Sequence, residues 1–134
     1  MTSKVVYSDN LRTELVHIKS NSQIINDAPV DNHGKGMAFS PTDLLATSLA
    51  SCMLTVVGIK AQSLKIDIKG SEALVQKYMT NNPRRVDSIE INVTFRGLLD
   101  IKTRKVFENI ALNCPVALSL NPNISQKISF SYTN

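Results

Sequence analysis

Hydrophobic and polar residues alternate along several segments of the chain, and this period of two is typical of strands with one buried face. The clearest case is the run in which Ile89, Ile91, Val93 and Phe95 alternate with polar residues, and residues 128–132 repeat the pattern. Further short strands are expected over residues 4–7, 11–18, 64–68 and 72–79, with turns at residues 8–10 and 80–84. Together these segments predict antiparallel sheet structure.

One long segment is instead apolar around nearly the whole circumference of a helix. Ser40, Pro41 and Asp43 predict the helix start, as cap, first helical residue and capping-box acid. The helix is expected to reach about residue 63, and one of its faces is predicted to carry Leu45, Leu49, Cys52, Val56 and Ile59. Its sixteen uncharged residues, 44–59, are fewer than the ~18–20 that span a bilayer. We therefore expect a buried central helix rather than a membrane span.

A second helix, amphipathic this time, is predicted over residues 101–113, with Asp100 as its cap. Phe107 lies on its apolar stripe, which leads to Cys114, and Pro115 ends the helix because the residue before a proline avoids helical geometry. A helix end of this kind is expected to leave Cys114 on a movable segment.

The long segment 26–39 contains two Gly and one Pro and predicts an ordered loop of a length that often carries function. With the strands and the two helices, it gives an α+β fold in which a single domain covers residues 1–134.

Composition narrows the class of protein. The 134 residues are 43% hydrophobic and 19% charged, as in globular domains, and the net charge is +4. Fifteen basic residues are spread without any block of like charges, which argues against a nucleic-acid partner. The first residues lack the apolar stretch of a signal peptide, so we expect a cytoplasmic protein with no membrane partner. A permanent disulfide is not expected in that reducing compartment.

The two cysteines, Cys52 and Cys114, therefore need another explanation: inert core packing, metal ligation or redox chemistry. A zinc site would have to add His17 and His33, but the chain has no metal-ligand spacing such as CxxC or HExxH, and no metal is expected. Cys–His acyl transfer has no supporting motif either. Redox chemistry gains weight because both predicted helices must share one core, which brings the two thiols into one region.

Two motifs resemble a known family. The run from Gly34 to Leu45, GKGMAFSPTDLL, is followed by Leu-Ala-Ser-Cys ending at Cys52, eleven residues after Pro41. The second motif is Cys-Pro-Val at residues 114–116, after the amphipathic helix. Both resemble the OsmC/Ohr family, named for osmotically inducible protein C and organic hydroperoxide resistance protein, over nearly the whole chain.

The resemblance implies an OsmC-like intertwined homodimer with a thiol-dependent peroxidase activity toward organic hydroperoxides and no cofactor. Cys52 would attack the peroxide and become a sulfenic acid, and Cys114 would resolve it as a disulfide that an external dithiol reduces. Arg12, the one arginine before residue 84, is the candidate cation beside the thiolate. The residues expected to bind substrate are Met37, Phe39, Thr42 and Leu49.

One position departs from the family pattern, because Thr42 follows Pro41 where peroxidase members carry a Glu that pairs with the Arg. Asp43 is either the capping acid alone or a replacement for that Glu. An alternative function from another class also stays open: a non-catalytic module that binds an apolar ligand in the dimer cleft.

Overall fold

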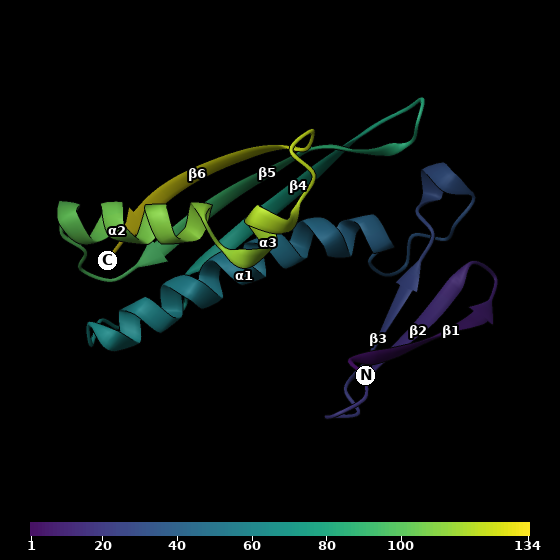
Figure 1. The fold of residues 1–134 in the computed structure, drawn as a ribbon, viewed down its shortest axis with the longest axis horizontal. Coiled ribbons are helices and arrows are strands. Elements are labelled where there is room, and N and C mark those ends of the chain that lie inside the picture. The colour runs from purple at the N-terminus through teal and green to yellow at the C-terminus, as the bar shows by residue number, and fades with distance from the viewer. The chain divides into compact units, whose positions relative to one another are not determined.

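The computed structural model describes residues 1–134, which form two compact units, Met1–Leu45 and Ala46–Asn134. The first unit contains the strands β1 (Ser3–Asp9), β2 (Arg12–His17) and β3 (Gln23–Asp27), which pair antiparallel in the order β1-β2-β3 (Figure 1). A short 3-10 helix, η1 (Val30–Asn32), lies in the loop that follows. The helix α1 (Pro41–Ser63) begins in this unit and continues through the second.

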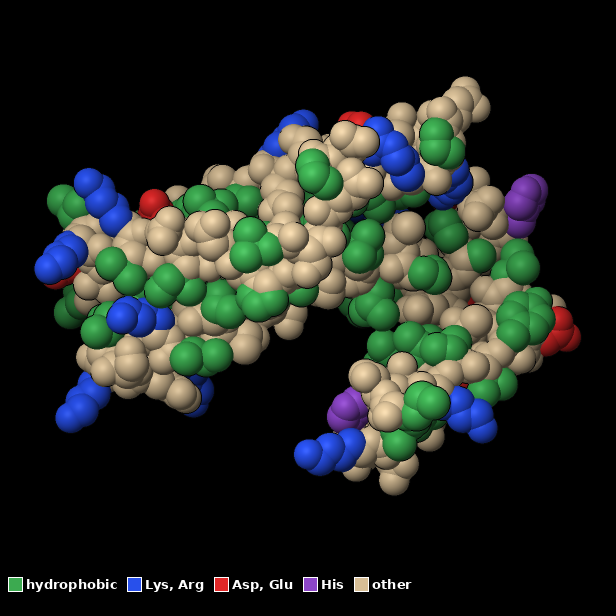
Figure 2. All heavy atoms as spheres, in the orientation of Figure 1, with side chains coloured by type: hydrophobic (Ala, Val, Ile, Leu, Met, Phe, Trp, Pro, Cys, Tyr) green, Lys and Arg blue, Asp and Glu red, His purple; other side chains and the backbone are tan.

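The first unit has no apolar core of its own. Its buried residues are polar, namely Asn26, Asp27 and Ser40, whereas every residue of β1 is exposed. Hydrophobic side chains on the three strands remain open, and Val5 and Tyr7 are both exposed. Figure 2 shows hydrophobic side chains on the surface of this unit. The strands therefore expose apolar side chains to solvent, and an exposed apolar surface of this kind usually marks an interaction site.

The second unit is a three-stranded sheet with helices packed on it. Its strands are β4 (Glu72–Thr80), β5 (Arg85–Arg96) and β6 (Ser125–Thr133), in the order β4-β5-β6. The connection from β5 to β6 contains α2 (Ile101–Leu112) and α3 (Pro115–Ser119). Asp100 caps α2 as predicted, since its carboxylate accepts a hydrogen bond of 2.7 Å from the N–H of Thr103.

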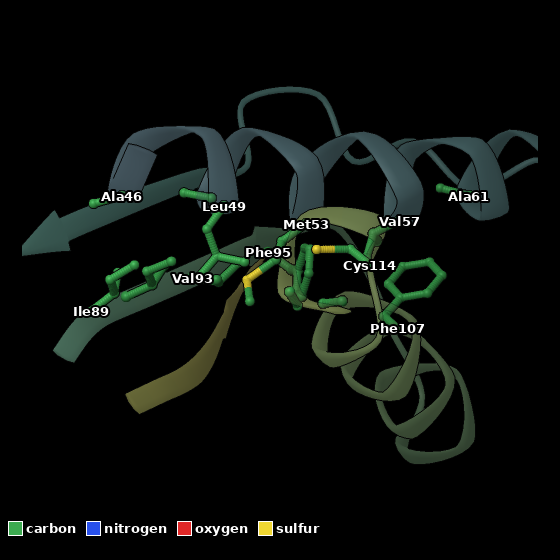
Figure 3. Packing of buried hydrophobic residues seen from close by; sticks show 14 of the residues in the cluster. Ala46, Leu49, Met53, Val57, Ala61, Ile89, Val93, Phe95, Phe107 and Cys114 are labelled. Atoms are coloured by element: carbon green, nitrogen blue, oxygen red, sulfur yellow. The ribbon is translucent and has the colours of Figure 1, made fainter. Parts of the chain in front are cut away.

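The core of the second unit lies between β5 and the helices (Figure 3). The alternating residues Ile89, Ile91, Val93 and Phe95 are at most 1% exposed, which confirms the predicted one-sided strand. They meet residues of α1, together with Phe107 and Cys114, and the rings of Phe95 and Phe107 pack edge to face with their centroids 5.8 Å apart. Burial of this apolar surface supplies the main driving force for folding the unit.

The α+β class is confirmed, and three details of the predicted strands are wrong. The prediction missed β3, where Ile24 and Ile25 are adjacent instead of alternating. Residues 64–68 follow α1 and form a turn and loop rather than a strand. β6 pairs parallel with β5, so the second sheet is mixed instead of antiparallel. The helical crossover between the two strands makes parallel pairing possible.

α1 is central, as predicted, but it is not covered on every side. Its buried face carries Ala46, Leu49, Ala50, Met53, Val57 and Ala61. The predicted face is wrong by about one residue around the helix: Leu45 is 38% exposed and Ile59 is 64% exposed. By length and composition α1 also suffices to cross a membrane, a test that core helices of soluble proteins pass as well. Within the second unit it packs on the sheet, which is the behaviour of a core helix.

Candidate functional site

The two cysteines lie close together in the second unit. Cys52 is on α1, partly exposed, and Cys114 is 1% exposed at the junction of α2 and α3; both are free thiols. The thiols are near enough to interact, because the Cys52 side chain contributes to the pKa of Cys114 both as a hydrogen-bond partner and by charge. The expectation that the two helices bring the thiols into one region is therefore met.

Burial governs the chemistry of Cys114. It raises the pKa of this thiol above its ordinary value, because a thiolate loses hydration in the apolar core. The backbone N–H groups of Ala117 and Val116 act in the opposite direction, since they donate toward the sulfur and favour the thiolate. Cys114 is therefore predominantly a protonated thiol near neutral pH and a poor first nucleophile.

The segment around Cys114 is fixed rather than movable. The Cys114 N–H donates to the carbonyl of Ala111 over 3.2 Å, and its carbonyl accepts from Leu118 over 3.1 Å. The helix predicted over residues 101–113 ends before Pro115 as expected, since α2 ends at Leu112. Pro115 then starts the short helix α3, where its lack of an N–H costs no hydrogen bond. The expectation of a loose helix end is wrong because both backbone groups of Cys114 are already bonded.

In the first unit, Arg12 forms a two-point ion pair with Asp27. The Arg12 Nε donates to Asp27 Oδ1 over 2.7 Å and the Nη2 donates to Oδ2 over 2.9 Å. The pairing holds the pKa of Asp27 below its usual range, first through the hydrogen bond from Arg12. The Asp27 side chain is 2% exposed, whereas that of Arg12 is 35% exposed. Arg12 thus has a carboxylate partner, which the sequence left unassigned.

The loop after β3 is held to the same strand by several hydrogen bonds. The Met37 N–H donates to Asp27 Oδ2 over 3.2 Å, and the Phe39 carbonyl accepts from the Asp27 N–H and from the side chain of Asn26. Gly34 is required for this packing, because a Cβ there would come 1.7 Å from the backbone oxygen of Ala28. The predicted ordered loop is confirmed.

This loop and the strands of the first unit form an open groove of about 890 Å³. Its apolar lining includes Met37 and Phe39, two of the residues expected to bind substrate, together with Ile24 and Ile25. Their side chains remain open, with Met37 75% exposed and Phe39 51% exposed. The groove offers an apolar surface to a small molecule or to another protein surface.

At the start of α1, Asp43 forms the capping box that its spacing predicts. The Ser40 N–H donates to Asp43 Oδ2 over 3.0 Å, and the Asp43 N–H donates to Ser40 Oγ over 3.0 Å. Thr42 faces this cap, with its hydroxyl 3.2 Å from Ser40 Oγ. The capping role of Asp43 is therefore confirmed.

The remaining candidates are dispersed. Leu49 is fully buried in the core of the second unit, and its contact with substrate stays a prediction. The Nδ1 of His17 is 2.7 Å from Ser20 Oγ, and His33 follows η1 in a left-handed conformation. No group of three or more His, Cys, Asp or Glu side chains has an arrangement for a metal ion.

Sequence reasoning missed Asp27, the buried acid that joins Arg12 to the loop. The loop predicted over residues 26–39 includes Asp27, because the sequence pattern predicts no strand at residues 23–27. One signal in the sequence points to it: the polar pair Asn26–Asp27 directly follows the apolar pair Ile24–Ile25, and such a step from apolar to polar residues is typical of a strand end.

Comparison with known proteins places these features in a family context. The chain is 59% identical to a structure from Psychrobacter arcticus described as an osmotic stress induced and detoxification response protein, with 97% of this chain and 95% of that chain covered and a TM-score of 0.94. An OsmC-like protein from Mycoplasma pneumoniae is 17% identical over 98% and 96% of the two chains, with a TM-score of 0.81.

An organic hydroperoxide resistance protein OsmC from Legionella pneumophila is 18% identical over 96% and 94% of the two chains, with a TM-score of 0.71. No curated protein matches the sequence. The OsmC-like protein family matches residues 33–129, a range that includes the loop, α1 and both cysteines. The chain therefore belongs to the OsmC-like protein family.

Proposed function

We propose that this protein is a thiol-dependent peroxidase for organic hydroperoxides, with Cys52 as the attacking thiol and Cys114 as the resolving thiol. The observation that carries the proposal is the proximity of the only two cysteines of the chain, one partly exposed and the other buried. Relatives of the same fold are named organic hydroperoxide resistance proteins, which supports the choice of substrate class.

The chemistry balances with these two residues and one external reductant. The Cys52 thiolate attacks one peroxide oxygen, the O–O bond breaks, and the leaving alkoxide takes a proton to become an alcohol. The sulfur is oxidised by two electrons to a sulfenic acid, and the peroxide is reduced by two. Cys114 then attacks that sulfur, the S–O bond breaks, water leaves and a disulfide forms. An external dithiol restores both thiols by exchange.

Accessibility and protonation support this assignment of roles. Burial keeps Cys114 protonated at neutral pH, so it does not compete as the first nucleophile. Cys52 is the more exposed of the two. In the proposed reaction Arg12 stabilises the Cys52 thiolate, and the apolar side chains of Met37 and Phe39 favour an organic substrate over hydrogen peroxide.

A homodimer is part of the proposal, in which the chain forms one OsmC-like domain completed by a second copy. The support is the uncovered apolar surface: Ile59 of α1 is 64% exposed, and the sheet of the first unit leaves Val5 and Tyr7 exposed. A second copy is the partner that would cover surfaces of this kind. A cytoplasmic location is proposed with it, because the reaction consumes reducing dithiols.

The test mixes reduced protein with cumene hydroperoxide or hydrogen peroxide and follows free thiols and the intramolecular disulfide with time. Cys52→Ser should abolish the reaction. Cys114→Ser should keep the first oxidation and accumulate sulfenic acid that dimedone traps, followed by overoxidation. Met53→Leu is the matched control, since it removes a neighbouring oxidisable sulfur while it conserves volume. Equal loss of the first step in both cysteine variants would refute the assigned roles.

The second candidate function, a non-catalytic module for apolar ligands, is favoured by the open groove around Met37 and Phe39. Thiols that ignore organic hydroperoxides, together with saturable binding of an apolar fluorescent probe, would select this function instead.

A further inference from the structure

We propose that Asp27 is the positioning residue of the site: one buried carboxylate fixes the Arg12 guanidinium and the Met37 segment of the loop in a single arrangement. The inference rests on the proposed function, in which Arg12 serves the reaction of Cys52. It adds a residue that the motifs of the sequence do not single out.

The contact between Arg12 and Asp27 determines orientation as well as charge. Two parallel hydrogen bonds, of 2.7 and 2.9 Å, join the planar guanidinium to the planar carboxylate. This two-point geometry leaves Arg12 little freedom to rotate, which a single charge contact would not achieve. The two residues are also directly opposite each other in the pairing of β2 and β3, so the backbone ladder fixes their separation.

Burial makes Asp27 the immobile member of the pair. Its side chain is 2% exposed, whereas that of Arg12 is 35% exposed. The bonds use the Nε and one terminal nitrogen of Arg12, and the other terminal nitrogen, Nη1, has no partner in the chain. The arrangement holds one edge of the guanidinium and leaves donors at the far edge for a reacting group.

The same carboxylate also holds the loop. Asp27 Oδ2 accepts the bond from Arg12 and a second bond of 3.2 Å from the Met37 N–H. A shift of the loop at Met37 therefore disturbs the acceptor on which Arg12 depends. Asp27 couples the cation to the apolar loop that lines the groove.

The other nearby acids do not fill this role. Asp43 accepts the Ser40 N–H in the capping box. Glu14 acts on Arg12 through longer-range charge, without a hydrogen bond. The presence of Thr42 after Pro41 therefore does not leave Arg12 without a carboxylate, because the partner comes from the end of β3.

The first experiment measures the rate of Cys52 oxidation by cumene hydroperoxide in Asp27→Asn, which keeps the shape and removes the charge. The expected result is a loss of at least about tenfold in rate, since misorientation of a catalytic group is costly. In an Arg12→Ala background the same change should alter the rate less than about twofold, because the two residues act as one unit. Asp87→Asn, at an exposed position of β5, controls for net charge.

Spectroscopy separates positioning from general stability. In wild type the Arg12 Nε–H should give a distinct, slowly exchanging NMR signal, and the Met37 amide should exchange slowly with solvent. Asp27→Asn should abolish the distinct Arg12 Nε–H signal and accelerate the exchange of the Met37 amide, while the Asp87→Asn control should change neither. If Asp27→Asn does not fold, Arg12→Lys provides the test, since it keeps the charge, loses the two-point contact and should also slow oxidation.

The outcomes distinguish this inference from the function on which it rests. If the thiols of the wild-type protein do not react with hydroperoxide, the proposed function is refuted and the inference with it. A reactive wild type that is slowed by Arg12→Ala but not by Asp27→Asn overturns the inference alone.

Discussion

The capping box at the start of α1 provides a prediction whose size follows from the structure. Two reciprocal bonds of 3.0 Å join Ser40 and Asp43 there, and Ser40 is 1% exposed. Asp43→Asn keeps an amide oxygen that can accept the Ser40 N–H, but it removes a negative charge from the positive end of the helix. Loss of the charge interaction and weakening of the hydrogen bond together should lower the free energy of unfolding by about 1 kcal/mol.

Ser40→Ala removes the acceptor of the Asp43 N–H and leaves that donor without its side-chain partner. The expected cost is about 1–2 kcal/mol, at the upper end of capping effects because the site is buried. The assay is urea unfolding followed by circular dichroism, at one fixed protein concentration because any dimer makes the midpoint concentration-dependent. Asp87→Asn, which changes the net charge equally at an exposed position, should leave the midpoint where it is.

The same variants decide whether Asp43 also serves the reaction. If Asp43 is only a cap, the rate at which cumene hydroperoxide oxidises Cys52 should be the same in Asp43→Asn as in wild type. A rate that falls, and that couples to Arg12→Ala in a double-mutant cycle, would refute this reasoning. So would an Asp43→Asn variant as stable as wild type, because the negative charge at the helix start would then contribute nothing to stability.

Two further predictions concern acid stability and assembly. Arg12 holds the pKa of Asp27 below its unfolded value of about 3.9. The ion pair therefore stabilises the folded state fully above that pH. This stabilisation is lost as the pH falls through the folded-state pKa of Asp27. The difference in urea midpoint between wild type and Asp27→Asn should accordingly shrink from pH 7 to pH 3, and a difference that grows on acidification would contradict this sign. Sedimentation velocity at low micromolar concentration should show a homodimer, and Ile59→Glu, at a 64% exposed position of α1, should shift it toward monomer; a wild type that sediments as a monomer would contradict the assembly.

Local patterns in the sequence predicted those elements that local physics determines. The start of α1, the cap at Asp100 and the alternation that ends at Phe95 depend on neighbours within a few residues, and the structure contains all three. The strand β3 was missed because its two isoleucines are adjacent, and adjacent strand residues point to opposite faces. The direction of β6 depends on where the helical crossover returns the chain, which no local pattern encodes.

In the candidate site, too, some features were predictable from the sequence and others depend on the tertiary structure. The proximity of Cys52 and Cys114 was predictable because two apolar helices of a small domain must share one core. The partner of Arg12 was not, since it required the pairing of β2 with a strand that the sequence did not reveal. The face of α1 was also misjudged: with nearly every position apolar, periodicity cannot tell the covered side from the open one.

The fixed position of Cys114 has a consequence for the competition between two oxidation routes. Its backbone is hydrogen-bonded into α2 on one side and α3 on the other, and those helices connect two neighbouring strands of one sheet. Under the proposed chemistry a sulfenic acid at Cys52 can meet either this thiol or a second hydroperoxide molecule. Folding has already placed the thiol beside it, so the effective concentration of that thiol is on the order of molar or above, far beyond any dissolved peroxide. The branching ratio toward the reversible disulfide is therefore a property of the folded chain and is independent of how quickly the external dithiol arrives.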